Sequence, residues 1–405
     1  MNLLLATEIV FWLSVSALFY TYVGYPLLLL LVSQVRPRFV HRSEFTPSVS
    51  IIITAYNEER ALADKLENTL LLEYPRDRVE IIVASDCSTD RTNQITRDYA
   101  ARGVRLHIQP HRLGKTAAQN AAVEQSHGEI LLFSDATSHY QSNVLHAIVP
   151  SFADPSVGCV AGRLVYVDPS ASSVGQGSRT YWDYEKFLKY HESRAGSLIG
   201  ASGCLYAVRR SAYVPLYPEA CSDFIIATKM VEQGLRAVYE PGAICTEETN
   251  RRVGNEMSMR VRVIAQTFTD LWRHRAMLNP LKSGFYAIQL LSHKIMRYMV
   301  PFLLIVVLIA SGVLVAASAS PIYSGVVVAQ LGFYLAAFSA WALERAGARS
   351  RLLALPQYFV LANLASLLAC YKFIRGERYA RWEPIREGLP TVTRSDAIAP
   401  EGSTV

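Results

Sequence analysis

Two apolar blocks enclose a long polar segment, and this arrangement restricts the fold more than any other feature of the chain. Residues 9–32 carry no charge over 24 positions, enough to cross a hydrocarbon core of about 30 Å. The first eight residues lack a basic side chain and no small-residue cleavage site follows, which favours a retained membrane helix over a signal peptide. Basic residues come next and place the following segment in the cytosol: Arg36, Arg38, His41 and Arg42.

The second apolar block begins near Met296 and contains three candidate membrane segments. Residues 299–317 and 322–343 are both long enough to cross, and a short turn joins them. Residues 352–371 are apolar but have basic residues on both sides, so a crossing would leave a basic tail outside. We therefore favour a re-entrant or interfacial segment there, and an interfacial helix over residues 281–291.

The composition agrees with a chain that lies partly in lipid. It is 51% hydrophobic and 18% charged, against roughly 25% charged in ordinary soluble proteins. This excludes disordered, collagen-like and disulfide-stapled secreted classes. The six cysteines show no zinc-binding spacing. The net charge of +6 is assigned to membrane-surface and phosphate contacts. Nucleic-acid binding is not predicted, because the basic residues gather at membrane boundaries without interleaved aromatics.

The segment between the blocks alternates short β-branched runs with helical spacing. Strands are predicted over 49–54, 79–84, 104–109 and 129–133, and helices over 58–72, 89–102 and 115–125. This order predicts an α/β fold with a parallel sheet and right-handed crossovers. Ligands then belong at the carboxyl ends of the strands.

Each predicted strand ends in a polar cluster. These clusters are Ala55–Glu58, Ser85–Asp90, His111–Lys115 and Ser134–Thr137. Any one of them is explained as a helix cap, but four at one sheet edge indicate a binding cleft. No Walker A or GxGxxG pattern follows the first strand, which argues against P-loop and dinucleotide enzymes. Carboxylates at strand ends suit a nucleotide and a hard divalent cation, Mg²⁺ or Mn²⁺.

The runs VSIIITAYNEE, SDCSTD, GKTAAQN and FSDAT resemble, in this order, family 2 glycosyltransferases of the GT-A fold. The later runs YWDYEKF, IGASGCLYAVRR, YEPGA and HKIMRYMVP are similar to the membrane-embedded polysaccharide synthases of the hyaluronan, chitin, cellulose and poly-N-acetylglucosamine branch. The likeness extends from about residue 47 to 385. It implies an α/β GT-A catalytic domain with a mostly parallel, Rossmann-like sheet, joined to an α-helical transmembrane region.

The resemblance also implies a donor site and a metal site. Its donor-binding residues are Ala55, Tyr56, Asn57, Glu58, Asp86, Lys115, Asp135 and Arg262. The DxD element, which binds Mg²⁺ or Mn²⁺, reads Asp135-Ala-Thr137, so only its first carboxylate is present. Thr137 is expected to bind the metal through its hydroxyl or a water. Arg262 takes the place of the QxxRW arginine, although the glutamine and tryptophan are missing; a basic helix facing anionic lipid is the alternative for this segment.

The same resemblance points to Asp223 as the general base, in the sequence Ser222-Asp223-Phe224. An inverting transfer needs one carboxylate to accept the proton of the attacking hydroxyl. The alternative for Asp223 is a helix cap. The acceptor side is expected to be formed by Tyr181, Trp182, Gly203 and Trp382.

These expectations define four segments. They are an N-terminal membrane helix and basic linker (1–46), a cytosolic GT-A domain (47–280), an interfacial helix with two to three membrane or re-entrant helices (281–374), and a C-terminal tail (375–405). The leading hypothesis is a multi-pass enzyme of the plasma (inner) membrane that moves a sugar from a UDP-sugar to a growing extracellular or capsular polysaccharide. The alternatives are transfer of a single sugar to a polyprenyl-phosphate or other lipid acceptor, and a non-catalytic nucleotide-binding scaffold. Expected partners are the donor, the acceptor and the bilayer, without nucleic acid, together with a second copy or an export complex.

Overall fold

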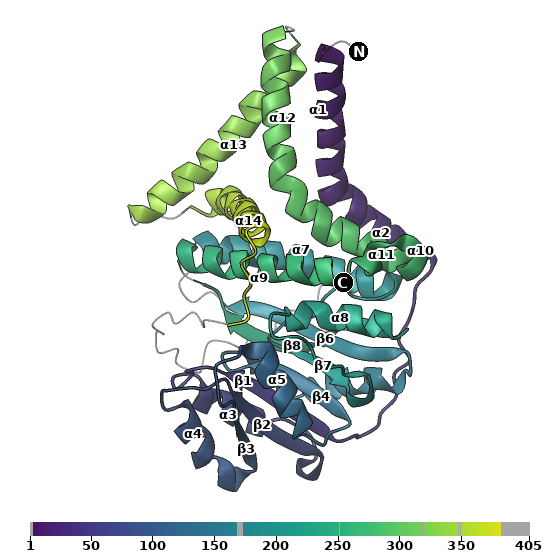
Figure 1. Cartoon of the computed structure of the whole chain (residues 1–405), viewed down its shortest axis with the longest axis vertical. Coiled ribbons are helices and arrows are strands. Elements are labelled where there is room, and N and C mark those ends of the chain that lie inside the picture. Colours follow the sequence, from purple (N-terminus) through teal and green to yellow (C-terminus); the bar gives the residue numbers. More distant parts are fainter. Residues whose placement is uncertain are drawn as a thin grey trace.

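The computed structural model describes residues 3–167, 173–250, 252–317, 320–346, 348 and 350–381. A sheet domain lies at one end and a group of long helices at the other, with α7 and α9 between them (Figure 1). The sheet has eight strands in the order β3-β2-β1-β4-β7-β6-β8-β5. Helices cover both faces of this sheet. Such cover is required because the strands are apolar along nearly their whole length.

The N-terminal half of the sheet is parallel, as the alternation of strands and helices predicts. β1 pairs with β2 and β4, and β2 pairs with β3, all in parallel register. The elements are β1 (Val49–Ala55), α3 (Leu62–Leu70), β2 (Val79–Ser85), α4 (Thr92–Asp98), β3 (Val104–Ile108), α5 (Lys115–Glu124) and β4 (Ile130–Asp135). The four predicted strands are confirmed to within two residues at each end. Two predicted helices are shorter than expected, because the residues after β1 and β2 form loops instead.

The other half is mixed. β7 (Tyr206–Arg209) pairs antiparallel with both β4 and β6 (Val157–Val167), and β8 (Arg236–Glu248) runs parallel to β6. The short β5 (His139–Tyr140) pairs antiparallel with β8. The helices of this half are α6 (Val144–Ile148), α7 (Ser173–Ala195), α8 (Ser222–Glu232) and α9 (Val253–Arg273). The sheet is thus mostly parallel, and only β7 and β5 run antiparallel to their neighbours among the described strands.

The alternation of side chains along the strands builds two cores. Ile51 and Ile53 face one layer of helices, whereas Ile52 faces the other, and all three are fully buried. This period of two follows from the pleat, which sends successive side chains to opposite faces. A buried apolar residue on both faces explains why β1 reads as an uninterrupted hydrophobic run.

Four helical stretches are long and apolar enough to cross a membrane: Leu3–Val35, Phe285–Ala317, Pro321–Arg345 and Arg351–Ile374. The first joins α1 (Leu3–Phe19) and α2 (Tyr25–Val35) through a π-helical turn. The second contains α11 (Phe285–Gln289), a π-helical turn over Leu290–Met296 and α12 (Arg297–Ala317), preceded by the single turn α10 (Pro280–Ser283). The last two are α13 (Pro321–Arg345) and α14 (Arg351–Ile374).

The helices differ in direction. α1 and α12 run side by side away from the sheet domain, whereas α14 lies against α7 and α9 (Figure 1). After α14 the chain turns back past α9, where the Gln266 side-chain amide donates to the Tyr379 carbonyl at 2.7 Å. Ala380 then lies against Gly114, directly before α5.

Candidate functional site

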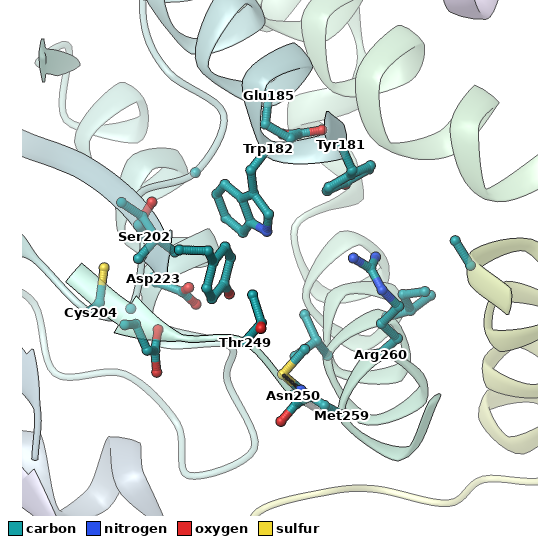
Figure 2. Close-up of a pocket in the computed structure, with 18 of the residues that line it drawn as sticks. Tyr181, Trp182, Glu185, Ser202, Cys204, Asp223, Thr249, Asn250, Met259 and Arg260 are labelled. Atoms are coloured by element: carbon teal, nitrogen blue, oxygen red, sulfur yellow. Dashed lines mark hydrogen bonds between the residues drawn. The ribbon is translucent and has the colours of Figure 1, made fainter. Parts of the chain in front are cut away.

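One cavity of about 2310 Å³ begins at the carboxyl edge of the sheet and continues between the long helices. Figure 2 shows its middle: Tyr181, Trp182 and Glu185 of α7 point into it, Asp223 and Ser202 lie on one side, and Arg260 of α9 lies opposite. Its far end is lined by apolar side chains of α1, α12, α13 and α14, among them Val15, Leu304, Val326, Phe333 and Leu355. The cavity therefore connects a polar site at the sheet edge with an apolar space between the long helices.

The loops after β1 and β2 form the polar wall of the cavity and are tied to each other. The Asn57 side-chain carbonyl accepts the backbone N–H of Thr89 at 2.7 Å. The backbone N–H of Glu58 donates to the Thr92 hydroxyl at 2.7 Å. Asn57 has a φ of 53°, a left-handed conformation that asparagine tolerates better than most residues. Both Asn57 and Glu58 line the cavity, as predicted for a donor site.

Three of the predicted donor residues are not among those lining the cavity. Ala55 is fully buried at the end of β1, and the Tyr56 ring packs under the Arg112 guanidinium, 3.8 Å from the ring centroid. Asp86 is fully buried, and its carboxylate accepts the backbone N–H groups of Leu113 and Gly114 at 2.9 to 3.1 Å. The carboxylate thereby fixes the loop that leads into α5.

Three charged groups converge on Gly203. Lys115, the first residue of α5, forms an ion pair with Asp135 at the end of β4. A Cβ added to Gly203 would lie 3.2 Å from Lys115 Nζ, 3.3 Å from Asp223 Oδ2 and 3.6 Å from Asp135 Oδ2. Glycine at this position leaves room for the three side chains to face the same space. The tertiary structure brings together four predicted residues here that lie up to 108 positions apart in the sequence.

Asp223 lies in the first turn of α8 and is held by its surroundings. The Cys221 thiol donates to its carboxylate at 3.1 Å, and its backbone carbonyl accepts the N–H of Ala201 at 2.7 Å. The same loop is supported by buried Lys189, which donates to Ser202 Oγ at 2.6 Å. Burial lowers the pKa of Lys189. These contacts hold the Asp223 carboxylate at the wall of the cavity.

A second carboxylate approaches Asp135 from β8. The Thr137 hydroxyl lies 3.5 Å from Glu247 Oε1, and both residues line the cavity with Asp135. Burial, followed by the nearby charge of Asp135, raises the pKa of Glu247 to about 7. Sequence reasoning missed this residue, because Glu247 lies more than 100 positions beyond the DxD-like element. Nothing in the strand's own sequence marks it.

The aromatic and basic residues of α7 and α9 form the middle of the cavity. The guanidinium groups of Arg260 and Arg297 each lie 4.8 Å from the centroid of the Tyr181 ring. Arg260 also pairs with Glu256 at 2.8 Å and contacts the Tyr358 hydroxyl, while Arg297 pairs with Glu185. Each arginine is thus fixed by a carboxylate and stacked on an aromatic face.

Of the remaining predicted residues, Trp182 and Arg262 also line the cavity, and Trp382 lies outside the described residues. The sequence had pointed to Arg262 as the main arginine. Arg260, two positions earlier on the same helix, makes the ring contacts described above. The sequence contains both arginines close together on α9, and their positions alone do not show which of them makes these contacts.

The oxygen donors around Asp135 fit a hard divalent cation. Within the described part of the chain, no group of three or more His, Cys, Asp or Glu side chains is arranged to hold a metal ion. Mg²⁺ and Mn²⁺ do not require one, since they are commonly held by one or two carboxylates together with substrate phosphates and waters. Asp135 and Thr137 offer a carboxylate and a hydroxyl on the cavity wall, beside the space that Gly203 leaves open.

The sequence of this site is similar to that of known enzymes. Residues 50–214 match the family Glycosyl transferase family 2. An N-acetylglucosaminyltransferase of Rhizobium sp. (strain N33) is 28% identical over 249 residues, covering 56% of this chain and 54% of the relative. A beta-monoglucosyldiacylglycerol synthase of Nostoc sp. is 28% identical over 170 residues, covering 41% of this chain and 36% of the relative. The chain thus spans about half or less of the length of these two relatives.

The fold is similar to that of a solved structure over nearly its whole length. A mannosyltransferase from Pyrobaculum calidifontis, solved in complex with GDP-Man and Mn²⁺, superimposes with a TM-score of 0.70 at 22% identity. The match covers 91% of this chain and 99% of that one. At this identity the likeness concerns the fold, which includes the long helices as well as the sheet domain.

Proposed function

Because residues 50–214 are a family 2 glycosyltransferase domain, we propose that this enzyme transfers a sugar from a nucleoside-diphosphate donor to the hydroxyl of a lipid-linked acceptor at the membrane surface. One observation carries the choice of acceptor. The cavity that contains Asp135 and Asp223 continues without interruption to the apolar residues between α1, α12, α13 and α14. An acceptor with a polar head and an apolar chain fits such a space along its whole length.

The donor is assigned to the sheet edge. Asn57 and Glu58 would contact the nucleoside, and Lys115 lies near enough to Asp135 to interact with the donor diphosphate. Asp135 and Thr137 would hold Mg²⁺ or Mn²⁺, which neutralises charge on the diphosphate leaving group. The UDP-sugar predicted from the sequence remains the expected donor. The GDP-Man in the Pyrobaculum calidifontis structure makes a GDP-sugar the second donor to test.

Asp223 is assigned as the general base. Its carboxylate would accept the proton of the acceptor hydroxyl while the hydroxyl oxygen bonds to the anomeric carbon and the carbon–diphosphate oxygen bond breaks. Asp223 lies in the first turn of α8, and its carboxylate and the Lys115 ammonium face the same space beside Gly203. Displacement from the face opposite the leaving group inverts the anomeric centre.

The acceptor head is assigned to the middle of the cavity. Tyr181 and Trp182 offer flat faces on which a sugar ring stacks, and Arg260, Arg297 and Lys294 line the same space. Fixed guanidinium groups at a membrane boundary suit an anionic linker between sugar and lipid. The polysaccharide hypothesis from the sequence assigns the same base and the same donor site. It differs in the product, which would be a polysaccharide chain and not a lipid-linked sugar.

The arrangement of α14 bears on the side of the membrane. We infer that α14 lies along the membrane interface and that the tail stays on the side of the catalytic domain, which is cytosolic by the positive-inside rule. Two observations support this: α14 packs on α7 and α9, and residues 379–380 contact Gln266 of α9 and Gly114 of the sheet domain.

The test is a transfer assay with purified full-length protein in lipid vesicles. Radiolabelled UDP- and GDP-sugars are supplied with Mn²⁺ or Mg²⁺, and with diacylglycerol, a polyprenyl phosphate or a polyprenyl-diphosphate sugar as acceptor. We expect one labelled sugar on a solvent-extractable lipid that carries a free hydroxyl. A high-molecular-weight product made without added lipid would instead support the polysaccharide hypothesis. Absence of transfer with every donor would contradict both.

A further inference from the structure

The DxD-like element of this chain lacks its second carboxylate, and β8 carries a partly buried carboxylate, Glu247, beside the gap. Thr137 stands where the resemblance expects an aspartate, and its hydroxyl lies 3.5 Å from Glu247 Oε1. Glu247 is far from this element in the sequence, yet it lines the cavity together with Asp135 and Thr137. The arrangement places a carboxylate where the motif alone has none.

The direction of the Glu247 side chain follows from the strand. Cys245, two residues earlier on β8, is buried, and its thiol donates to the Cys204 carbonyl at 3.6 Å. Side chains at i and i+2 of a strand share a face. Glu247 therefore points toward the same 202–204 loop, where Asp135 and Asp223 face Gly203. Glu248 alternates to the other face of β8 and is exposed, although it also lines the wide cavity.

We infer that Glu247 is the second carboxylate ligand of the divalent cation, in place of the missing aspartate at position 137. The ligand set would then be the carboxylates of Asp135 and Glu247 and the hydroxyl of Thr137, with the donor diphosphate completing the coordination. Such an all-oxygen set, with one or two carboxylates and substrate phosphates, is what Mg²⁺ and Mn²⁺ prefer. This assignment rests on the proposed function only for the presence of a donor diphosphate.

The competing explanation is that Glu247 has a purely structural role. A carboxylate with a purely structural role commonly has a salt-bridge partner, as Glu240 of the same strand has in Arg42 at 2.6 Å. Among the described residues, the ion pairs include Lys115 with Asp135 but none with Glu247. Its hydrogen-bond contact is with Thr137, a residue that already belongs to the DxD-like element. Glu247 thus contacts Thr137 of the DxD-like element, whereas Lys115 pairs with Asp135.

The experiment measures Mn²⁺ binding directly, without sugar transfer. Full-length protein in detergent is titrated with Mn²⁺ in the presence of UDP or GDP, and free Mn²⁺ is followed by electron paramagnetic resonance. We expect Glu247→Gln to weaken Mn²⁺ binding by at least about tenfold, whereas the matched control Glu248→Gln, which removes a neighbouring charge from the same cavity, should lose clearly less. The double variant Thr137→Asp with Glu247→Gln restores the DxD pattern and should recover most of the lost affinity.

Several outcomes overturn the assignment. One is Glu247→Gln binding Mn²⁺ within twofold of the wild type. Another is an equal loss in Glu248→Gln, which would indicate a general electrostatic effect of β8. If Glu247→Gln lowers the thermal unfolding midpoint, Glu247→Asp is the second variant; it keeps the charge and should bind Mn²⁺ with intermediate affinity, and wild-type affinity in it would count against the assignment.

The result separates the two proposals. A wild-type chain that binds Mn²⁺ through Glu247 but transfers no sugar would leave this inference standing and remove the proposed function. If the wild type transfers sugar and Glu247→Gln binds Mn²⁺ as the wild type does, the proposed function stands and the assignment of Glu247 is removed.

Discussion

Ala380 lies where a side chain on Gly114 would begin. A Cβ built on Gly114 would overlap the Ala380 carbonyl oxygen, and Gly114 has a φ of 100°, a conformation that favours glycine. Gly114 also donates its N–H to Asp86 and precedes Lys115. The chain after the last helix is therefore docked on the loop that positions a lysine of the donor site.

Replacing Gly114 by alanine should damage both the tail contact and the donor loop. We expect a loss of about 1–2 kcal/mol from the positive φ alone, and faster proteolytic cleavage after residue 374. The matched control is Gly254→Ala in α9, where an added Cβ meets nothing within 4 Å. Thermal unfolding and limited proteolysis of both variants in detergent check this; equal behaviour of the two would contradict the docking.

Asp223→Asn should lower the rate of transfer by about 10²–10⁴-fold, the usual contribution of a general base. Binding of the nucleoside diphosphate should be unchanged, because the diphosphate is assigned to Lys115 and to the cation at Asp135 and Thr137, not to Asp223. The measurements are initial rates and nucleotide titration calorimetry. Asp98→Asn, on the opposite side of the sheet domain in α4, is the control. Transfer at the wild-type rate in Asp223→Asn would remove Asp223 as the base.

Arg260→Lys tests the acceptor side. Lysine keeps the charge but loses the planar group that pairs with Glu256 and stacks on Tyr181 and Tyr358. We expect the KM for the lipid acceptor to rise about tenfold, which corresponds to about 1.4 kcal/mol, with the donor KM unchanged.

The control for Arg260 is Arg273→Lys on the same helix. Arg273 also stacks on a tyrosine, Tyr217, and pairs with Glu219 at 3.6 Å, but it is not among the cavity residues. A larger rise in the donor KM than in the acceptor KM of Arg260→Lys would argue against an acceptor-binding role.

Asp270 should make the stability of the fold depend on pH. It is fully buried on α9, accepts hydrogen bonds from the Tyr217 hydroxyl and the Cys221 N–H, and burial raises its pKa to about 8. In the unfolded chain an aspartate has a pKa of about 3.9. Between these values the folded state holds a proton that the unfolded state has lost, so stability falls as pH rises, by about 1.4 kcal/mol per unit.

The measurement is the thermal unfolding midpoint in detergent from pH 5 to pH 9. The wild type should lose stability as pH rises toward about 8, and Asp270→Asn should show a flatter profile. The exposed Asp98→Asn is expected to keep the wild-type slope. An identical slope in Asp270→Asn would show that another group titrates in this range.

The sequence predicted the N-terminal half of the sheet well because its signals are local. Val49–Ala55 and Val79–Ser85 are apolar runs bounded by turn residues, and a parallel βα alternation leaves little choice of topology. The second half was not predicted in this detail. β7 is only four residues long and pairs antiparallel with β4, and short strands without alternation carry little periodic signal.

The two apolar blocks, over residues 9–32 and from about residue 296 to 371, determined that this chain is associated with a membrane and that a polar α/β domain lies between them. Hydrophobic length and strand-end carboxylates are properties of neighbouring residues, so the sequence pattern pointed to Asp135, and a family resemblance pointed to Asp223. Only the tertiary structure decided that Lys115, Asp135 and Asp223 meet around Gly203, and that Glu247 reaches Thr137. Those contacts join residues of different elements, and their distances depend on how sheet and helices pack, which no local pattern encodes.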